Sequence, residues 1–284
     1  MTDPSLRHSL LDAQQQLAAW LDADEARAEA EWLLCHALHC ERSHLYTWPD
    51  KTLDSAQRQH FEQLLARRLR GEPMAYIKGE KEFWSRRFEV GSGCLIPRPE
   101  TELLVEFALA HCDRDHALSL LDAGTGSGAI AVTLACECPH WRISASDIDE
   151  AALRLARRNA DAHGADIRFI RSDWFSAIDA RFDVIISNPP YIASGDPHLE
   201  QGDLRFEPRQ ALAAGGDGLD ALRVLCSQAP EHLNAGGWLL LEHGHDQMQA
   251  VRALLQANGF DNIQQLHDHA GVPRLSAGQR VQQR

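Results

Sequence analysis

The chain has 284 residues, a length that fits one or two domains of ordinary size. Hydrophobic residues make up 44% and charged residues 24%, a globular mixture that excludes a largely disordered or collagen-like chain. There are 41 acidic and 28 basic side chains, and the resulting net charge of −13 argues against non-specific binding to nucleic acid, because binding to phosphates needs a basic surface.

The sequence carries no sign of a membrane span or a secretion signal. It contains no apolar run of about 18 residues, and Met1 to Arg7 lack an apolar signal region. The seven cysteines are an odd number without the spacing of a disulfide framework. We therefore expect reduced thiols in a cytoplasmic protein that has no membrane partner.

Residues 1–73 are predicted to form a small helical domain. Apolar residues recur at helical spacing over residues 6–20 and 26–38, and a third helix over 61–69 ends before Gly71 and Pro73. The segment has no glycine-rich loop, which favours a packing or partner-docking role over a catalytic one. Its basic cluster, Arg67-Arg68-Leu69-Arg70, indicates a solvated helix end, with contact to a partner as the alternative.

Residues 74–96 are predicted to form a β-hairpin linker. Residues 76–77, 82–84 and 87–90 resemble strands, and glycines at 79, 91 and 93 interrupt them. A helix is expected to begin within Pro97-Arg98-Pro99-Glu100-Thr101, which would open a second domain over residues 97–284.

The second domain is predicted to be α/β, because strand and helix patterns alternate along it. Strands are expected over 118–122, 141–146, 167–170, 182–187, 238–242 and 262–266, and helices over 129–137, 150–163, 219–233 and 247–258. Such alternation predicts a mostly parallel sheet with helices on both faces. Ligands of these sheets bind at the carboxyl ends of the strands. We draw no expectation for the tail after Gly271.

A glycine-rich turn follows the first of these strands. It contains Gly124-Thr125-Gly126-Ser127-Gly128 and leads directly into the first helix. Such a turn lets a ligand approach the backbone closely, although its spacing differs from the Gly-x-Gly-x-x-Gly of dinucleotide sites.

Two acidic residues extend this candidate cofactor site. Asp147 ends the second strand, 19 residues after Gly128, and can accept both ribose hydroxyls of an adenosine. NAD and S-adenosylmethionine both present that ribose, and capping of the following helix is the alternative role. Asp173 and Trp174 end the third strand and suit the edge and face of an adenine, although Trp174 could equally belong to the core.

The most informative segment follows the fourth strand and contains Asn188-Pro189-Pro190-Tyr191. The two prolines stiffen the backbone and hold Asn188 in extended geometry. The Asn188 side-chain carbonyl and the Pro189 backbone carbonyl are two adjacent acceptors that fit a planar NH₂ group, and Tyr191 offers a ring to pack against it.

This pairing of the glycine turn with Asn-Pro-Pro-Tyr resembles class I S-adenosylmethionine-dependent methyltransferases that act on planar amino groups. Further segments resemble the peptide chain release factor N5-glutamine methyltransferases (the HemK/PrmC family) over nearly the whole chain. These segments are residues 71–73, 82–84, 95–102, 172–175 and 203–208. The resemblance implies a Rossmann-like methyltransferase sheet.

The resemblance also implies the substrates and the site residues. The protein substrate would be the glutamine of the Gly-Gly-Gln motif in class 1 release factors, with no direct nucleic acid partner. Gly124 to Gly128 would line the methionine part of S-adenosylmethionine, Asp147 would bind its ribose, and Asp173 with Trp174 would border its adenine. Asn188 to Tyr191 would hold the glutamine, with Asn188 and Pro189 as the catalytic acceptors and Asn188 also bordering the cofactor. An N-methyltransferase acting on a nucleic acid base is the alternative.

The other groups of potentially reactive side chains are expected to have structural roles. Glu242 and His243 end the fifth strand, and a dedicated base is not evident. Two His-x-His pairs, residues 243–245 and 267–269, lack the spacing of a catalytic zinc site and are assigned surface or capping roles, so no metal is expected. Cys136 and Cys138 are interpreted as thiols at a helix end.

Overall fold

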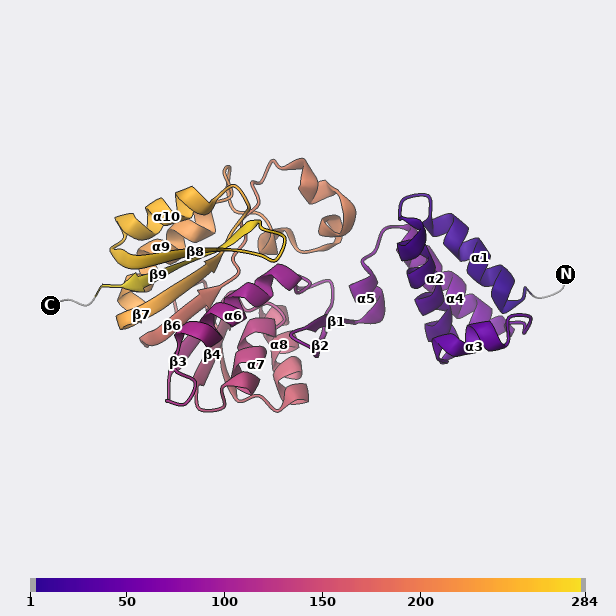
Figure 1. The fold of residues 1–284 in the computed structure, drawn as a ribbon, viewed down its shortest axis with the longest axis horizontal. Helices are drawn as coiled ribbons and strands as arrows, with labels where there is room; N and C mark the ends of the chain where they lie inside the picture. The colour runs from indigo at the N-terminus through magenta and orange to yellow at the C-terminus, as the bar shows by residue number, and fades with distance from the viewer. Residues whose placement is uncertain (1–3, 282–284) are drawn as a thin grey trace. The chain divides into compact units, whose positions relative to one another are not determined.

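The computed structural model describes residues 4–281, and the chain divides into two compact units, Met1–Lys78 and Gly79–Arg284. The first unit is helical (Figure 1). Its helices are α1 (Leu6–Leu17), α2 (Ala23–Leu38), α3 (Arg42–Thr47), α4 (Ser55–Leu69) and α5 (Met74–Lys78).

Local signals in the sequence fix where these helices start. The Asp22 carboxylate accepts hydrogen bonds from the backbone N–H groups of Asp24 and Glu25, at 2.9 and 2.8 Å. Asp54 and Gln57 form a reciprocal capping box at the start of α4. Such caps satisfy N–H groups that have no partner inside the helix. Leucines and alanines from α1, α2 and α4 then form one buried core within this unit.

The basic cluster at the end of α4 is a solvated helix end only in part, because Leu69 and Arg70 are exposed whereas Arg68 is buried. Arg68 is only 5% exposed, and its guanidinium lies 4.3 Å from the centre of the Trp20 ring. It also pairs with Glu29 at 2.6 Å, while Arg67 pairs with Glu72. Arg68 is buried because a planar guanidinium can stack on an indole and bind a carboxylate at the same time.

The predicted hairpin exists, but it is shorter than expected. Strands β1 (Glu80–Phe83) and β2 (Arg86–Glu89) pair antiparallel. The two residues between them, Trp84 and Ser85, have φ of 51° and 54°, as a two-residue hairpin loop requires, so Trp84 is not in a strand. Tyr76 and Ile77 are also not in a strand, because they lie in α5 with their side chains buried.

The second unit is an α/β domain built on a seven-stranded sheet (Figure 1). After the hairpin come the 3₁₀ helix η1 (Pro99–Thr101) and α6 (Glu102–His111). The remaining elements are β3 (Ser119–Ala123), α7 (Ala129–Glu137), β4 (Arg142–Asp147), α8 (Glu150–His163), β5 (Ile167–Arg171), β6 (Phe182–Ser187), the 3₁₀ helices η2 (Pro197–Glu200), η3 (Gly202–Phe206) and η4 (Arg209–Ala211), α9 (Asp220–His232), β7 (Leu233–Glu242), α10 (Met248–Ala257), β8 (Phe260–His267) and β9 (Pro273–Arg280).

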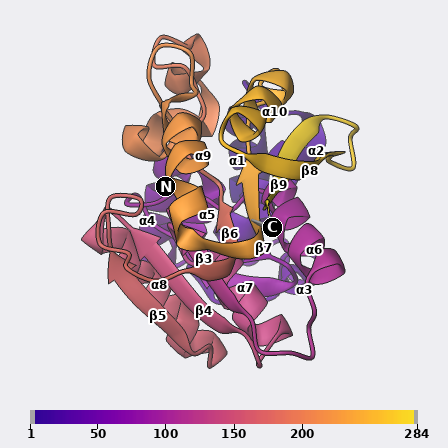
Figure 2. The ribbon, with the colours of Figure 1, turned by 90° about the vertical axis from the view of Figure 1, so that its left-hand side faces the viewer.

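The strand order is β5-β4-β3-β6-β7-β9-β8, and the first five of these strands are parallel. From β3 the chain moves outward through β4 and β5, and it then returns to add β6 and β7 on the other side. Helices α6, α7 and α8 cover one face, and α9 and α10 cover the other (Figures 1 and 2). The order of the strands reverses between β3 and β6, which is where such sheets bind ligands.

In the tail after Gly271, for which we drew no expectation, residues 273–280 form β9. This strand inserts antiparallel between β7 and β8. Its sequence has no β-branched residue, so strand propensity does not reveal it. The predicted strand over 262–266 lies within β8, which forms the edge of the sheet. No helix within residues 4–281 has the length and apolarity needed to cross a membrane.

Candidate active site

A cavity of about 300 Å³ lies at the carboxyl edge of the sheet, around the point where the strand order reverses. Its walls come from the segment that leads into η1, from the glycine turn, from the ends of β4, β5 and β6, and from η4. The lining residues that carry the argument below are Thr101, Gly124, Thr125, Gly126, Ser127, Asp147, Ile148, Asp173, Trp174, Asn188, Pro190 and Gln210. A volume of this size suits a small-molecule ligand.

The glycine turn forms one wall of the cavity in the backbone conformation that glycine permits. Gly124, Gly126 and Gly128 have φ of 77°, 55° and 83°. Gly128 does not line the cavity: a Cβ there would lie 3.0 Å from the Cβ of Ala156, so its place is in the packing of α7 against α8. The other four residues of the turn, Gly124 to Ser127, face the cavity.

Asp147 ties the glycine turn to the end of β4. Its Oδ2 accepts from the Gly126 N–H at 2.9 Å, and its Oδ1 accepts from the Asp149 N–H at 2.9 Å. Burial raises the pKa of Asp147, and the two N–H groups oppose that rise. Asp147 does not cap α8, because Asp149 does so by accepting from the Ala151 N–H. A carboxylate has about four acceptor positions, so Asp147 can still accept from a ligand.

Asp173 and Trp174 form the wall that follows β5. Asp173 is exposed and Trp174 is half-buried, and both line the cavity. The indole of Trp174 packs partly on the core under α9 and α10, so this side chain both contacts the core and lines the cavity. Its edge lies next to Gly124, where an added Cβ would be 3.6 Å away.

The fourth-strand segment contributes Asn188 and Pro190 to the cavity, while Pro189 is buried and does not line it. The Asn188 Nδ2 donates to the Thr101 Oγ1 at 3.0 Å. The side-chain carbonyl of Asn188 is therefore directed away from Thr101. Just before this segment, the Ser187 hydroxyl donates to the Ala123 carbonyl at 2.6 Å, which holds the ends of β6 and β3 together.

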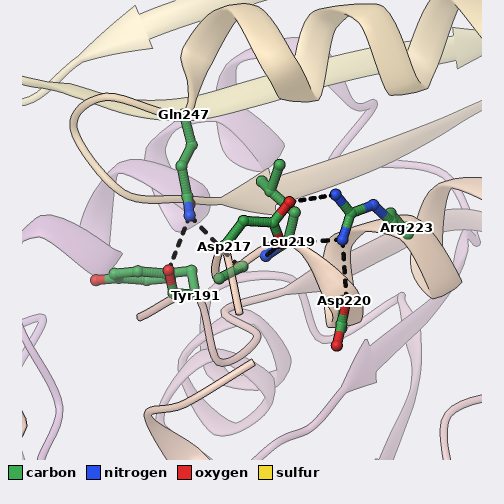
Figure 3. Close-up of polar contacts among 7 residues, drawn as sticks. Tyr191, Asp217, Leu219, Asp220, Arg223 and Gln247 are labelled. Atoms are coloured by element: carbon green, nitrogen blue, oxygen red, sulfur yellow. Dashed lines mark hydrogen bonds and ion pairs between the residues drawn. The ribbon is translucent and has the colours of Figure 1, made fainter. Parts of the chain in front are cut away.

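Tyr191 is not among the residues that line the cavity, although the sequence placed its ring against the substrate. Its hydroxyl donates to Glu242 Oε1 at 3.2 Å. Its backbone carbonyl accepts from Gln247 Nε2 at 2.8 Å (Figure 3). Tyr191 thus anchors the Asn-Pro-Pro-Tyr segment to the end of β7 and the start of α10.

The loop before α9 is fixed at the same anchor. Gln247 Nε2 also reaches the Gly218 carbonyl at 3.4 Å, and a Cβ at Gly218 would lie 2.3 Å from the Tyr191 carbonyl oxygen. Arg223 binds both Asp217 and Asp220 beside it (Figure 3). Only glycine fits at position 218, so the loop can pass directly behind Tyr191.

Sequence reasoning missed the contacts made by the segment before α6. Ile96 N–H donates to Glu207 Oε2 at 3.0 Å, and Arg98 pairs with Glu207 Oε1. Glu207 is buried, and burial raises its pKa against the effect of Arg98. These bonds join residues more than 100 positions apart, beside the cavity. Both segments, residues 95–102 and 203–208, are part of the family resemblance, but no local sequence pattern predicts that they are in contact.

The candidate metal and thiol groups have structural surroundings. His243 is fully buried, with Nε2 3.0 Å from the Ser276 hydroxyl and Nδ1 2.9 Å from the Gly244 carbonyl, so its contacts are structural, as expected, but it does not lie at the surface. Within residues 4–281, no three His, Cys, Asp or Glu side chains are grouped in a way that could hold a metal ion. All seven cysteines are free thiols, and α7 ends between Cys136 and Cys138.

The fold and the cavity together define a Rossmann-like class I methyltransferase. Residues 100–271 match the "Methyltransferase small domain" family, and residues 10–79 match the "PrmC N-terminal domain". A crystal structure of a methyltransferase from Pyrococcus furiosus has the same fold, with a TM-score of 0.54 and 20% identity over 78% of this chain and 99% of that one.

Curated relatives identify the family. A release factor glutamine methyltransferase of Xylella fastidiosa is 50% identical over 254 residues, which cover 89% of this chain and 92% of the relative. A protein of the same name from Coxiella burnetii is 43% identical over 97% of this chain and 99% of its own length. The chain belongs to the release factor glutamine methyltransferase family. The resemblance drawn from the motifs is thereby confirmed.

Asp122, at the end of β3 beneath the glycine turn, is a fully buried acid that the sequence analysis did not single out. Its Oδ2 accepts from the Thr125 hydroxyl at 2.6 Å. Burial raises the pKa of Asp122 to about 7, and the Thr125 hydroxyl only partly opposes this. The acid therefore holds the glycine turn through Thr125 at the cost of burying a charge above neutral pH.

We predict that Asp122→Asn raises the free energy of unfolding at pH 8 by a few kcal/mol, roughly 1.4 for each unit of pKa shift. The folded-state pKa lies above the unfolded one, so the wild type loses stability as the pH rises toward and through about 7. The gain should therefore shrink at pH 5. Urea unfolding at the two pH values measures it, with Asp161→Asn on the exposed side of α8 as the control. A gain in stability that is equal at both pH values would contradict the raised pKa of Asp122.

Proposed function

We propose that the protein transfers the methyl group of S-adenosylmethionine to the side-chain amide nitrogen of the glutamine in the Gly-Gly-Gln motif of class 1 release factors. The observation that carries the proposal is the identity of about half of all residues, over almost the full length, with relatives named for that activity. The Asn-Pro-Pro-Tyr segment beside the cavity supports it, because it offers acceptors to a planar amide.

The residues around the cavity fit the proposed cofactor. Gly124 and Gly126 leave room for close approach, and the Trp174 indole provides a flat apolar wall. We infer that Asp147 accepts from both ribose hydroxyls with the acceptor positions that Gly126 and Asp149 leave free, and that Asp173 and Trp174 border the adenine. Ile148 lines the same part of the cavity and is 54% exposed, which suits a side chain that a ligand covers.

The substrate amide needs positioning more than activation. Its nitrogen is a poor nucleophile because the lone pair is delocalised, whereas the sulfonium of the cofactor supplies a methyl group that is already electrophilic. We infer that Asn188 Oδ1 and the Pro189 carbonyl accept the two amide hydrogens and so direct the nitrogen. These hydrogen bonds strengthen as positive charge develops on the nitrogen, which favours the transition state.

A nucleic acid base presents a similar exocyclic amine, so base methylation is the alternative. It would require an extruded base and a basic channel along the strand. The net charge of −13 and the names of the curated relatives favour the protein substrate.

The decisive experiment incubates the protein with labelled S-adenosylmethionine and either a purified class 1 release factor or an RNA and DNA mixture. Mass spectrometry then locates the label. Label on the Gly-Gly-Gln glutamine supports the proposal, and label on nucleic acid alone supports the alternative. A release factor with that glutamine replaced by alanine is the matched control.

We predict that Asp147→Asn weakens S-adenosylmethionine binding about tenfold or more, because each charge-assisted hydrogen bond to a hydroxyl contributes about 1.5–3 kcal/mol. Asparagine keeps one acceptor for the N–H groups of Gly126 and Asp149 and alanine keeps none, so the glycine turn should be disturbed less than by alanine. Calorimetry measures the dissociation constant, and Asp161→Asn serves as the control. An unchanged constant would contradict the ribose assignment, and tighter binding of NAD would contradict the cofactor.

We predict that Asn188→Ala lowers the turnover number by about 10²–10³, the usual loss for one transition-state hydrogen bond in a closed site. Asn188→Asp should be similarly poor, since it cannot donate to Thr101 Oγ1 as the native amide does. Single-turnover rates at saturating cofactor measure both variants. Near wild-type rates for the alanine variant would mean that another group positions the amide.

We also infer that the helical unit docks the protein substrate, with the hairpin linking it to the methyltransferase domain. We predict that a chain of residues 79–284 keeps its affinity for S-adenosylmethionine, because every residue lining the cavity lies within Gly79–Arg284. Its methylation of an intact release factor should fall far more than its methylation of a short Gly-Gly-Gln peptide. Comparing the two substrates isolates docking, and equal loss on both would contradict that role.

A further inference from the structure

One side chain of α8, Asn159, binds both the end of the hairpin and the glycine turn. Its Oδ1 accepts from the backbone N–H of Glu89 at 2.8 Å, and its Nδ2 donates to the backbone carbonyl of Glu89 at 3.0 Å. The same Nδ2 donates to the Ser127 carbonyl at 2.8 Å. Asn159 is only 2% exposed, so water does not compete for these three hydrogen bonds.

The three hydrogen bonds at Asn159 need an amide. An amide side chain has two N–H donors and one carbonyl acceptor, and here both donors meet backbone carbonyls while the acceptor meets a backbone N–H. A carboxylate would set an acceptor against the two carbonyls. Leucine, which has a similar size, would leave all three backbone groups without this partner, and a buried backbone group without a partner is costly.

Both partners of Asn159 belong to segments that form walls of the cavity. Ser127 is part of the glycine turn, lines the cavity itself and is 3% exposed. Glu89 ends β2, and the chain continues from it into residues 93–95 and Pro97, which line the cavity as well. The Asn159 side chain therefore holds the glycine turn and the start of a second wall at one point of α8.

Two other side chains of α8 bind the hairpin at the surface. Arg158 pairs with the Glu89 carboxylate at 2.8 Å, and His163 Nε2 lies 2.8 Å or less from the hairpin, at 2.7 Å from the Arg87 carbonyl oxygen. Both side chains are exposed, and exposed ion pairs contribute little to stability. Within residues 4–281, the contact between this part of α8 and the Ser127 carbonyl is made by Asn159.

We propose that Asn159 is a positioning residue for S-adenosylmethionine, which keeps the glycine turn and the segment after β2 at the separation that the cofactor needs. The inference rests on the proposed cofactor. Asn159 is not among the residues that line the cavity, so it acts through Ser127 and through residues 93–97. Its loss should weaken cofactor binding more than methyl transfer, because the Asn188 segment follows β6 and makes no hydrogen bond with Asn159 within residues 4–281.

The test measures the dissociation constant of S-adenosylmethionine by calorimetry for Asn159→Leu and Asn159→Asp. Leucine removes all three hydrogen bonds, and an ionised aspartate removes both donors. We expect each variant to bind the cofactor roughly tenfold more weakly, the effect of one or two net hydrogen bonds. Arg158→Gln is the matched control, because it breaks the neighbouring contact with the same Glu89 and leaves the glycine turn bound. Its dissociation constant should stay within about twofold of wild type.

Two readouts separate positioning from a simple loss of stability. With a release factor as substrate, the KM for S-adenosylmethionine should rise with the dissociation constant, whereas kcat at saturating cofactor should stay within about threefold of wild type. Relative to wild type, Asn159→Asp should also regain affinity when the pH is lowered from 8 to 6. A carboxyl group buried beside two carbonyls takes up a proton and then becomes a donor, which leucine cannot do.

Three results would overturn the proposal. One is a folded Asn159→Leu variant whose dissociation constant lies within twofold of wild type, and another is an Arg158→Gln variant that binds as weakly as the leucine variant. The third is an Asn159→Asp variant whose affinity, relative to wild type, is the same at pH 6 and 8. If Asn159→Leu does not fold, the two measurements on Asn159→Asp decide alone.

Failure of the proposed function is visible separately. A wild-type protein that binds S-adenosylmethionine but leaves the Gly-Gly-Gln glutamine unlabelled contradicts the proposed substrate and not the role of Asn159. A wild-type protein that does not bind S-adenosylmethionine contradicts the proposed cofactor before any variant is compared.

Discussion

The pairing of β3 with β6 is the constraint on which the site depends. These strands are neighbours in the sheet, with Asp122 beside Ile186, although 64 residues separate the two positions. Because parallel strands end at the same edge, the glycine turn after β3 and the Asn-Pro-Pro-Tyr segment after β6 emerge side by side. The bond from Ser187 to the Ala123 carbonyl fixes their relative height. The glycine turn and the Asn188 amide, which we propose to bind the cofactor and to position the substrate, thus lie close together without a long insertion in either segment.

Buried acids support both halves of this junction. Asp122 lies under the glycine turn, and Glu242 lies behind the Asn-Pro-Pro-Tyr segment, and burial raises the pKa of each to about 7. An apolar residue of the same size would be cheaper to bury, but it could not accept from Thr125 or Tyr191. The local cost in stability is balanced by the orientation of groups that face the cavity, as is usual where a site breaks the rules of core packing.

Most of the fold could be predicted from the sequence because its signals are local. Helices α7 and α8 and strand β6 have the predicted bounds, since each has clear periodicity and a glycine or turn at its end. The failures arise where the local pattern does not decide the structure. Residues 76–77 resemble a strand but lie in α5, and β9 lacks strand-forming residues and exists because β7 and β8 flank it. Pairing across the sheet overrode propensity there.

The residues of the site also fall into two groups, those that the sequence reveals and those that it does not. Residues at strand ends, such as Asp147 and Asn188, can be found because the chain pattern places them at one edge. Thr101 could not be found, since its bond to Asn188 joins positions 87 residues apart and neither residue type marks it.

That bond also bears on why position 188 needs an amide rather than another acceptor. A carboxylate at this position has no N–H to donate to the Thr101 Oγ1, and it would add a negative charge to the wall of the cavity. An amide has one donor end and one acceptor end. Because the Asn188 Nδ2 donates to the Thr101 Oγ1 at 3.0 Å, the carbonyl end of this amide is left free of that contact. In the function that we propose, a neutral and weakly nucleophilic substrate amide therefore meets a neutral acceptor whose orientation is set by Thr101.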